Sequence, residues 1–135
     1  METLMKKTLF GFLCVVWLSI AGSALAHHSP AVFDRTKEVK LVGVVKEFKW
    51  GNPHSWIELD VRSGTGNAAG PVDRWAIEMN PAVYLVKAGW KSTTIKPGET
   101  VTVIINPLRT SEKSGKFVSI TLSTGQVLKD TLPTP

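Results

Sequence analysis

Apolar and polar residues alternate along much of the chain after residue 38, which is the pattern of half-buried β-strands. From Ser55 to Arg62 the odd-numbered positions face a core, and the even-numbered positions carry an indole, two carboxylates and a guanidinium. In the last long strand we expect a core face of Val118, Ile120 and Leu122. The same alternation predicts strands at 39–50, 55–62, 74–79, 101–105, 117–122 and 127–128.

A short helix is predicted between the third and fourth strands, over residues 82–88. Asn80 is placed to cap its first N–H groups, and Pro81 suits the first helical position. Gly89 suits the residue that ends the helix. The residues expected to be buried are Ala82, Leu85 and Val86.

Three strands, a helix, two strands and a final hairpin form the predicted element order. This order matches the OB-fold, a five-stranded Greek-key barrel, and Gly43 would bend the first strand. We therefore predict a mainly β fold, a small five- to six-stranded OB-like barrel with one short helix between strands 3 and 4. A β-sandwich is the alternative, but it does not account for the helix. The barrel is predicted at 39–130, between an extended arm at 27–38 and a flexible tail at 131–135.

The first 26 residues have the features of an export signal. Lys6 and Lys7 precede an apolar run at 9–20, and Ala24 and Ala26 form the small-x-small pattern of a signal-peptidase site. The run is shorter than the about 20 residues that a membrane-spanning helix needs. We therefore expect cleavage after Ala26 and a periplasmic or secreted protein without a stable membrane anchor, with retention as an anchor as the alternative.

Composition narrows the function classes. The chain has 135 residues, a formal net charge of +5 and one cysteine, Cys14, which lies inside the apolar run. One domain is expected, without a disulfide framework or a cysteine-based zinc site. No run of five like charges is present, so we expect no nucleic-acid partner. Nucleophile-elbow, zinc-protease and phosphate-loop motifs are absent, so we expect a protein that is not an enzyme.

Several motifs together resemble a known family, the small exported bacterial proteins grouped as domain of unknown function 6152. The resemblance implies export and a compact domain, and it implies no activity. The motifs that carry it are His27-His28-Ser29, Gly43-Val44-Val45, Trp50-Gly51-Asn52-Pro53-His54-Ser55-Trp56, Gly89-Trp90, Lys96-Pro97-Gly98-Glu99-Thr100-Val101 and Asn106-Pro107-Leu108-Arg109.

The three histidines suggest a copper site. Cleavage after Ala26 would make His27 the amino terminus, and its amine and imidazole would form a chelate. A second imidazole from His28 or His54 would complete a planar nitrogen set, which suits Cu(II). The site resembles the histidine brace of lytic polysaccharide monooxygenases, whose fold is different.

Two other interpretations of the histidines stay open. Cleavage after Ala24 would place His27 third in the chain, where the amine, two backbone amides and the imidazole also form a square-planar chelate. In the other interpretation, a terminus of this kind binds copper adventitiously, and His54 bonds a backbone group in its turn.

A metal-free recognition surface is the second hypothesis. In OB-folds the ligand face lies on strands 2 and 3 with the loops that join strands 1 to 2 and 4 to 5. Here the loops are predicted at 50–56 and 106–116, with Trp50, Trp56 and Arg109 as candidate ligand-binding residues, near Lys113 and Lys116. Aromatic rings beside cations suit a cell-envelope glycan or a protein partner. The partner classes are thus a periplasmic protein, a glycan or a metal donor or acceptor. A structural accessory domain without a ligand is the third hypothesis.

Overall fold

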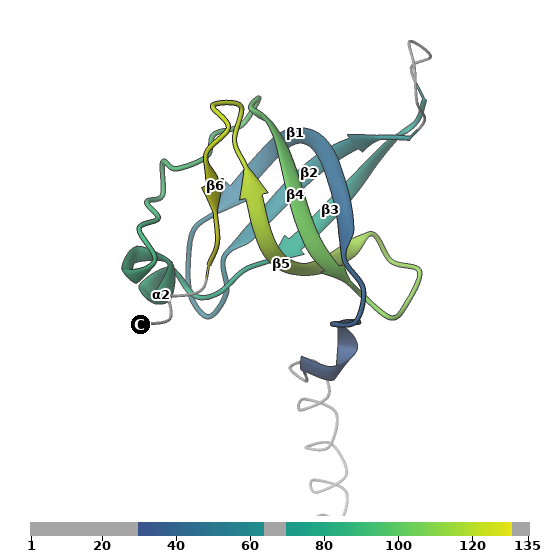
Figure 1. Ribbon diagram of the computed structural model, residues 1–135, viewed down its shortest axis with the longest axis horizontal. Coiled ribbons are helices and arrows are strands. Elements are labelled where there is room, and N and C mark those ends of the chain that lie inside the picture. Colours follow the sequence, from purple (N-terminus) through teal and green to yellow (C-terminus); the bar gives the residue numbers. More distant parts are fainter. Residues whose placement is uncertain (1–29, 64–69, 131–135) are drawn as a thin grey trace, which may run out of the picture. The chain divides into compact units, whose positions relative to one another are not determined.

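The computed structural model describes residues 30–63 and 70–130, and within them the chain folds into an OB-like β-barrel (Figure 1). The prediction of a mainly β, OB-like barrel with one short helix between strands 3 and 4 is confirmed. The described elements are the 3-10 turn η3 (Pro30–Val32), β1 (Val39–Lys49), β2 (Trp56–Arg62), β3 (Val72–Glu78), α2 (Ala82–Lys87), β4 (Thr100–Pro107), β5 (Ser114–Thr121) and β6 (Val127–Leu128).

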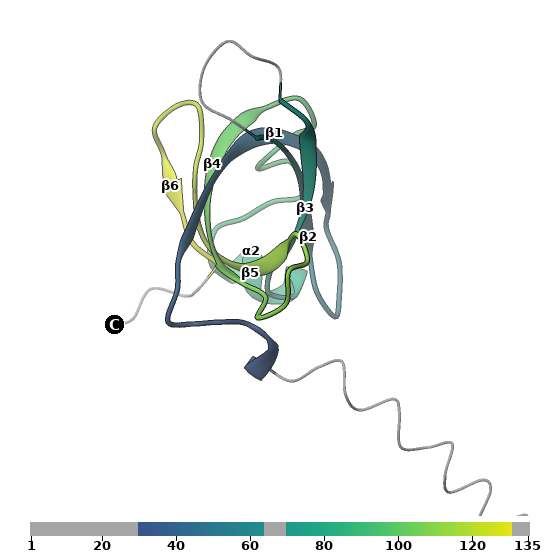
Figure 2. The same ribbon diagram turned by 90° about the vertical axis from the view of Figure 1, so that its right-hand side faces the viewer.

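A short parallel pairing closes the barrel. The strand order is β3-β2-β1-β4-β5-β6, and β3 also pairs with β5 in parallel from Ala76↔Ser114 to Glu78↔Lys116. The Ser114 hydroxyl donates a 2.7 Å hydrogen bond to the Ala76 carbonyl at this seam. Figure 2 shows the ring of strands, with β6 outside it against β5. This closure excludes the β-sandwich.

The core lies inside the ring and consists of one face of each long strand. Ile57 and Leu59 on β2, Ile77 on β3, and Val103 and Ile105 on β4 are completely buried. Burying a side chain of this size contributes about 1.5–3 kcal/mol. The alternation predicted from Ser55 onward is therefore the division between the interior of the barrel and its outer surface.

β1 is shared between two neighbours. Its first half pairs with β4 and its second half with β2, and Val44 belongs to both pairings. At Gly43 an added Cβ would lie 2.6 Å from the backbone oxygen of Asp60. β1 and β2 thus approach too closely for a side chain here, which is the physical reason for glycine in the strand.

The predicted core face of β5 is wrong in part. Phe117 and Ile120 are buried, whereas Val118 is only half-buried. Ile104 pairs with Ser119 and Ile105 with Phe117, so Val118 is an extra residue in a β-bulge. A bulge shifts the alternation by one position, and the alternation predicted from Val118 therefore fails at the start of the strand.

Two predictions about the helix are also wrong. No side-chain hydrogen bond caps α2, since the residue at the cap position is Pro81. Asn80 bonds elsewhere, because its amide nitrogen Nδ2 donates to the Asp130 carbonyl at 3.1 Å. Val86 is 60% exposed, and only Ala82 and Leu85 are buried. Gly89 follows the helix with a φ of 88°, as predicted for the residue that ends it.

The segment before β1 is attached to the barrel. Phe33 is buried and forms a β-bridge with Leu108, and the N–H of Asp34 donates to the Pro107 carbonyl at 2.8 Å. The described part of the predicted arm thus holds a 3-10 turn and an anchored residue. The loop predicted at 106–116 covers only residues 108–113, because β4 continues to Pro107 and β5 begins at Ser114. The predicted export signal and the tail at 131–135 lie outside the described residues.

No helix among the described residues is long and apolar enough to cross a membrane.

Candidate functional site

The two loops predicted to frame a site lie at the same end of the barrel (Figure 1). They are the β1–β2 loop, residues 50–55, and the β4–β5 loop, residues 108–113. The β1–β2 loop is fixed against the start of α2, because the Ala82 N–H donates to the Gly51 carbonyl at 2.9 Å. Buried Ser55 holds its other end through a bond from the Met79 N–H to the Ser55 carbonyl, also 2.9 Å.

His54 points from this loop to the end of β3. Its Nδ1 atom is closed off from solvent and lies 2.9 Å from Glu78 Oε1. The two atoms are close enough for an ion pair when the imidazole is protonated, but the ring N–H does not point at the carboxylate well enough for a hydrogen bond. The same Glu78 oxygen lies 3.4 Å from Lys116 Nζ on β5. One carboxylate therefore joins the β1–β2 loop, β3 and β5.

A buried carboxyl group lies near this cluster. Asp130 is 5% exposed and accepts a 3.0 Å hydrogen bond from the Asn80 N–H. Burial raises the pKa of Asp130, while the Asn80 N–H and the Lys116 charge oppose that rise. The cluster of His54, Glu78, Lys116 and Asp130 therefore holds two carboxyl groups. Glu78 pairs with a cation, whereas burial disfavours the charged form of Asp130.

The predicted aromatic residues have different environments. Trp50 packs edge to face on Phe48 at 5.6 Å between ring centroids, and it contacts the core. Trp56 is half-buried on the outer face of β2, where its register partners are Lys49 and Glu78. Trp56 is thus next to Glu78 of this cluster. Trp50 is mainly a packing residue.

The cations of the β4–β5 loop pair with acidic residues of the protein. Arg109 Nη1 lies 3.8 Å from Asp34 Oδ1. Lys113 lies 3.1 Å from Asp73 and stacks 5.6 Å from the centre of the Trp75 ring. Of the predicted cations, Lys116 is the one that the structure joins to His54, through Glu78.

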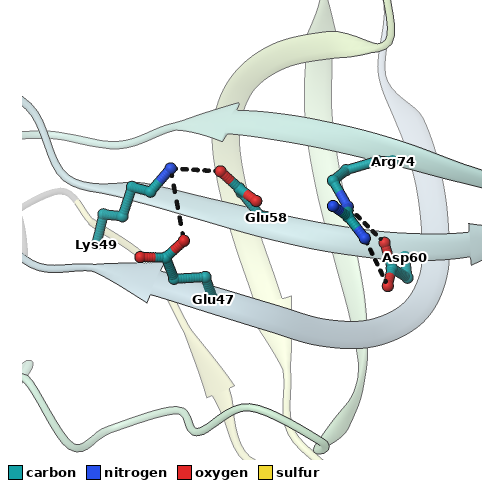
Figure 3. A network of polar contacts seen from close by, with 5 residues as sticks. All are labelled: Glu47, Lys49, Glu58, Asp60 and Arg74. Carbon is teal, nitrogen blue, oxygen red and sulfur yellow. Dashed lines mark hydrogen bonds and ion pairs between the residues drawn. The ribbon is translucent and has the colours of Figure 1, made fainter.

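Charged side chains cover the outer face of β1, β2 and β3 in cross-strand pairs (Figure 3). Lys49 pairs with Glu58 and lies 3.5 Å from Glu47. Arg74 holds Asp60 with two hydrogen bonds of 2.9 and 3.3 Å, and these bonds lower the pKa of Asp60. Glu58 raises the pKa of Lys49 through its hydrogen bond. The two carboxylates of β2 are therefore engaged in ion pairs.

The same face is hollowed further along, where β2 and β3 leave β1. A groove of about 340 Å³ lies there. Its apolar lining comes from exposed valines of β1 and β3, and Asp60 and Arg62 contribute charge. The complete lining is Val42, Gly43, Val44, Asp60, Arg62, Val72 and Thr100.

Among the described residues, no group of three or more histidine, cysteine or acidic side chains is arranged to hold a metal ion. His27 and His28, two of the three predicted ligands, lie outside the described residues. His54 is the predicted ligand whose geometry is visible.

Sequence reasoning placed Lys116 near the site but missed its partner Glu78, and it also missed Asp130. Glu78 and Lys116 follow the outward alternation of their strands, but only the parallel β3–β5 pairing brings them together. No local motif marks Asp130, which lies 50 residues from its partner Asn80.

The chain belongs to the family described as "Family of unknown function (DUF6152)", whose model matches residues 15–117. None of the curated proteins matches the chain. Among solved structures, the chain is similar to the mitochondrial single-stranded DNA-binding protein Rim1 of S. cerevisiae. That match has 12% identity and a TM-score of 0.46, and it covers 64% of this chain and 94% of the other.

Proposed function

We propose that this member of the DUF6152 family is an exported, periplasmic binding protein that holds copper through its histidines. His27 would be the bidentate terminal ligand, and His28 or His54 would supply further nitrogen donors. The terminal amine suits this role because its ordinary pKa is about 7.7–8.0, so a metal displaces its proton readily near neutral pH. Nitrogen donors in a plane are the set that Cu(II) prefers.

The contact between His54 and Glu78 supports the proposal most directly. Metal-binding histidines commonly donate their second ring N–H to a carboxylate, which fixes the tautomer and makes the other nitrogen a better donor. The 2.9 Å approach of Nδ1 to Glu78 places a carboxylate beside the ring, and a turn of the imidazole would complete this bond and direct Nε2 to a metal. Glu78 would then be a positioning residue for His54.

Chain length is compatible with a meeting of the terminus and His54. Val32 is held at the β4–β5 loop, because its carbonyl accepts a 3.0 Å bond from the Arg109 N–H. One row of paired residues runs across β4, β5 and β3 through Asn106, Lys116 and Glu78. At the usual spacing of strands, Glu78 on β3 is about 10 Å from Asn106 on β4. His27 precedes Val32 by five residues. The first three steps reach up to about 10 Å and the 3-10 turn η3 adds about 4 Å, so the reach is up to about 14 Å.

The test begins with the protein isolated from the periplasm, whose N-terminal residue is read from its intact mass. Cu(II) is then titrated into the wild type and into His54→Ala, Glu78→Gln and Glu47→Gln. We expect His54→Ala to lower the affinity at least tenfold and to change the nitrogen couplings in the paramagnetic resonance spectrum. Glu78→Gln should act in the same direction by about tenfold or more. Glu47→Gln, an exposed carboxylate beside Lys49, is the control.

An unchanged affinity and spectrum in His54→Ala would show that the three-histidine site is wrong and that only a terminal chelate binds copper. An N-terminus other than His27 or Leu25 would remove the chelate as well.

The second candidate function is a metal-free recognition module for a cell-envelope glycan or a protein partner. The outer face of β2 and β3 favours it, since OB-folds use this face for ligands. Trp56 lies on this face at the loop end of β2, four residues before Asp60 of the groove. Trp56 and the predicted Trp50 and Arg109 would contribute to binding. In this case Trp56→Ala abolishes capture of the envelope component, and a chelator has no effect. Capture that survives Trp56→Ala contradicts this function.

A further inference from the structure

Helix α2 exposes an apolar surface that the barrel does not use. Val83, Tyr84 and Val86 are 52, 52 and 60% exposed. With 3.6 residues per turn, Val83, Tyr84 and Lys87 lie on the side opposite the buried Ala82 and Leu85, and Val86 lies between Ala82 and Val83 at the edge of that side. Figure 1 shows α2 at the margin of the molecule, outside the ring of strands. We call Val83, Tyr84, Val86 and Lys87 the helix patch.

Positive charge predominates around the helix patch. Residues 79–98 contain Lys87, Lys91 and Lys96 and no acidic residue. Three acidic groups border this segment in the fold. Glu99 follows Gly98 and accepts a 3.1 Å hydrogen bond from the Lys96 N–H, so it offsets Lys96 but not Lys87 and Lys91. Glu78 already pairs with Lys116, and Asp130 is buried.

Lys87 distinguishes between the classes of surface that could cover the patch. On the helix it falls between Val83 and Tyr84, and its Nζ atom lies 5.6 Å from the centre of the Tyr84 ring. The centre of a protein–protein interface is depleted in lysine, because the charge would be buried without water. At a lipid surface the aliphatic stem lies along the apolar residues while the ammonium group reaches the headgroups.

We propose that the helix patch docks reversibly on an anionic phospholipid surface. Val83 and Val86 would enter the boundary between headgroups and acyl chains. Tyr84 would lie at headgroup level, where amphipathic rings are favoured. Lys87 and Lys91 would contact lipid phosphates. Each lysine near such a surface is worth about 1 kcal/mol, which is about fivefold in partitioning. The docking needs no metal and is independent of the copper proposal.

The chain provides its own probe, since Tyr84 is its only tyrosine. The full-length protein labelled with fluorotyrosine therefore gives a single fluorine NMR signal from the patch itself, whichever other segment touches lipid. The signal is measured with vesicles of phosphatidylcholine, and with vesicles of equal parts phosphatidylcholine and phosphatidylglycerol. Both kinds carry a spin-labelled lipid.

We expect the Tyr84 signal to broaden with the anionic vesicles, with at least about fivefold stronger partitioning than with phosphatidylcholine. The double variant Val83→Ser/Val86→Ser should lose most of this effect. The control is Val42→Ser/Val72→Ser, which changes valines of 53 and 50% exposure on the barrel face.

Three results would overturn the proposal. The first is a Tyr84 signal that anionic vesicles leave unchanged. The second is an equal loss in the control variant, and the third is a signal that changes with protein concentration in the absence of lipid, which would show that a second copy covers the patch.

Discussion

At the residue scale, single side chains hold together elements that the chain order keeps apart. Glu78 joins a loop histidine to a lysine of β5, and Asn80 joins the start of the helix to Asp130. At other positions the neighbouring strands leave no room for a side chain. Gly43 is one such position, because β1 and β2 approach closely there, and Gly115 is another.

We predict that Gly43→Ala destabilises the protein by about 1–3 kcal/mol, the usual cost of overpacking. The new Cβ would meet the Asp60 backbone oxygen at 2.6 Å and Leu59 Cγ at 2.9 Å, and a backbone atom in a sheet cannot move away cheaply. The control is Gly51→Ala, whose Cβ would have no atom within 4 Å. Urea denaturation measures both free energies of unfolding, and equal values for the two variants would contradict this explanation.

At the element scale, the strands could be predicted because each has one face inside the barrel and the alternation records it. The register of β5 could not be predicted. The extra residue Val118 reverses the alternation of buried and outward positions, and nothing in the composition marks it. The site shows the same limit. His54 stands out as a rare residue in a turn, whereas Glu78 becomes significant only through the β2–β3 and β3–β5 pairings, which link residues far apart in the chain.

Helix α2 shows how few contacts hold a short element. Leu85 is completely buried and Val86 is 60% exposed, although the two are adjacent and both apolar. We predict that Leu85→Ala costs about 2–5 kcal/mol, while Val86→Ala stays within about 0.5 kcal/mol of the wild type. Thermal and urea unfolding of both variants provide the measurement. A similar loss in both would mean that the outward side of the helix is covered in solution.

At the scale of the whole molecule, the barrel distributes its acidic groups so that they respond to pH in opposite directions. Hydrogen bonds from Thr36, Arg74 and Lys113, respectively, hold the pKa values of Asp34, Asp60 and Asp73 below the ordinary 3.8. These groups add stability above pH 3.8 that is lost as the pH falls through their lowered pKa values. Asp34 is buried, whereas Asp60 and Asp73 are half-buried and pair with exposed cations, so the contributions of these two are small.

Asp130 acts in the opposite direction because burial raises its pKa above 3.8. Between 3.8 and the raised value the folded protein binds more protons than the unfolded chain, so the free energy of unfolding falls as the pH rises through this window. We predict that Asp130→Asn, which cannot ionise, gains stability relative to the wild type across this window and keeps a constant difference at higher pH. Urea titrations of both proteins at a series of pH values measure that difference. A difference that moves in favour of the wild type as the pH rises would mean that the Asn80 N–H and Lys116 outweigh burial, and that Asp130 is held as a charged partner of the site.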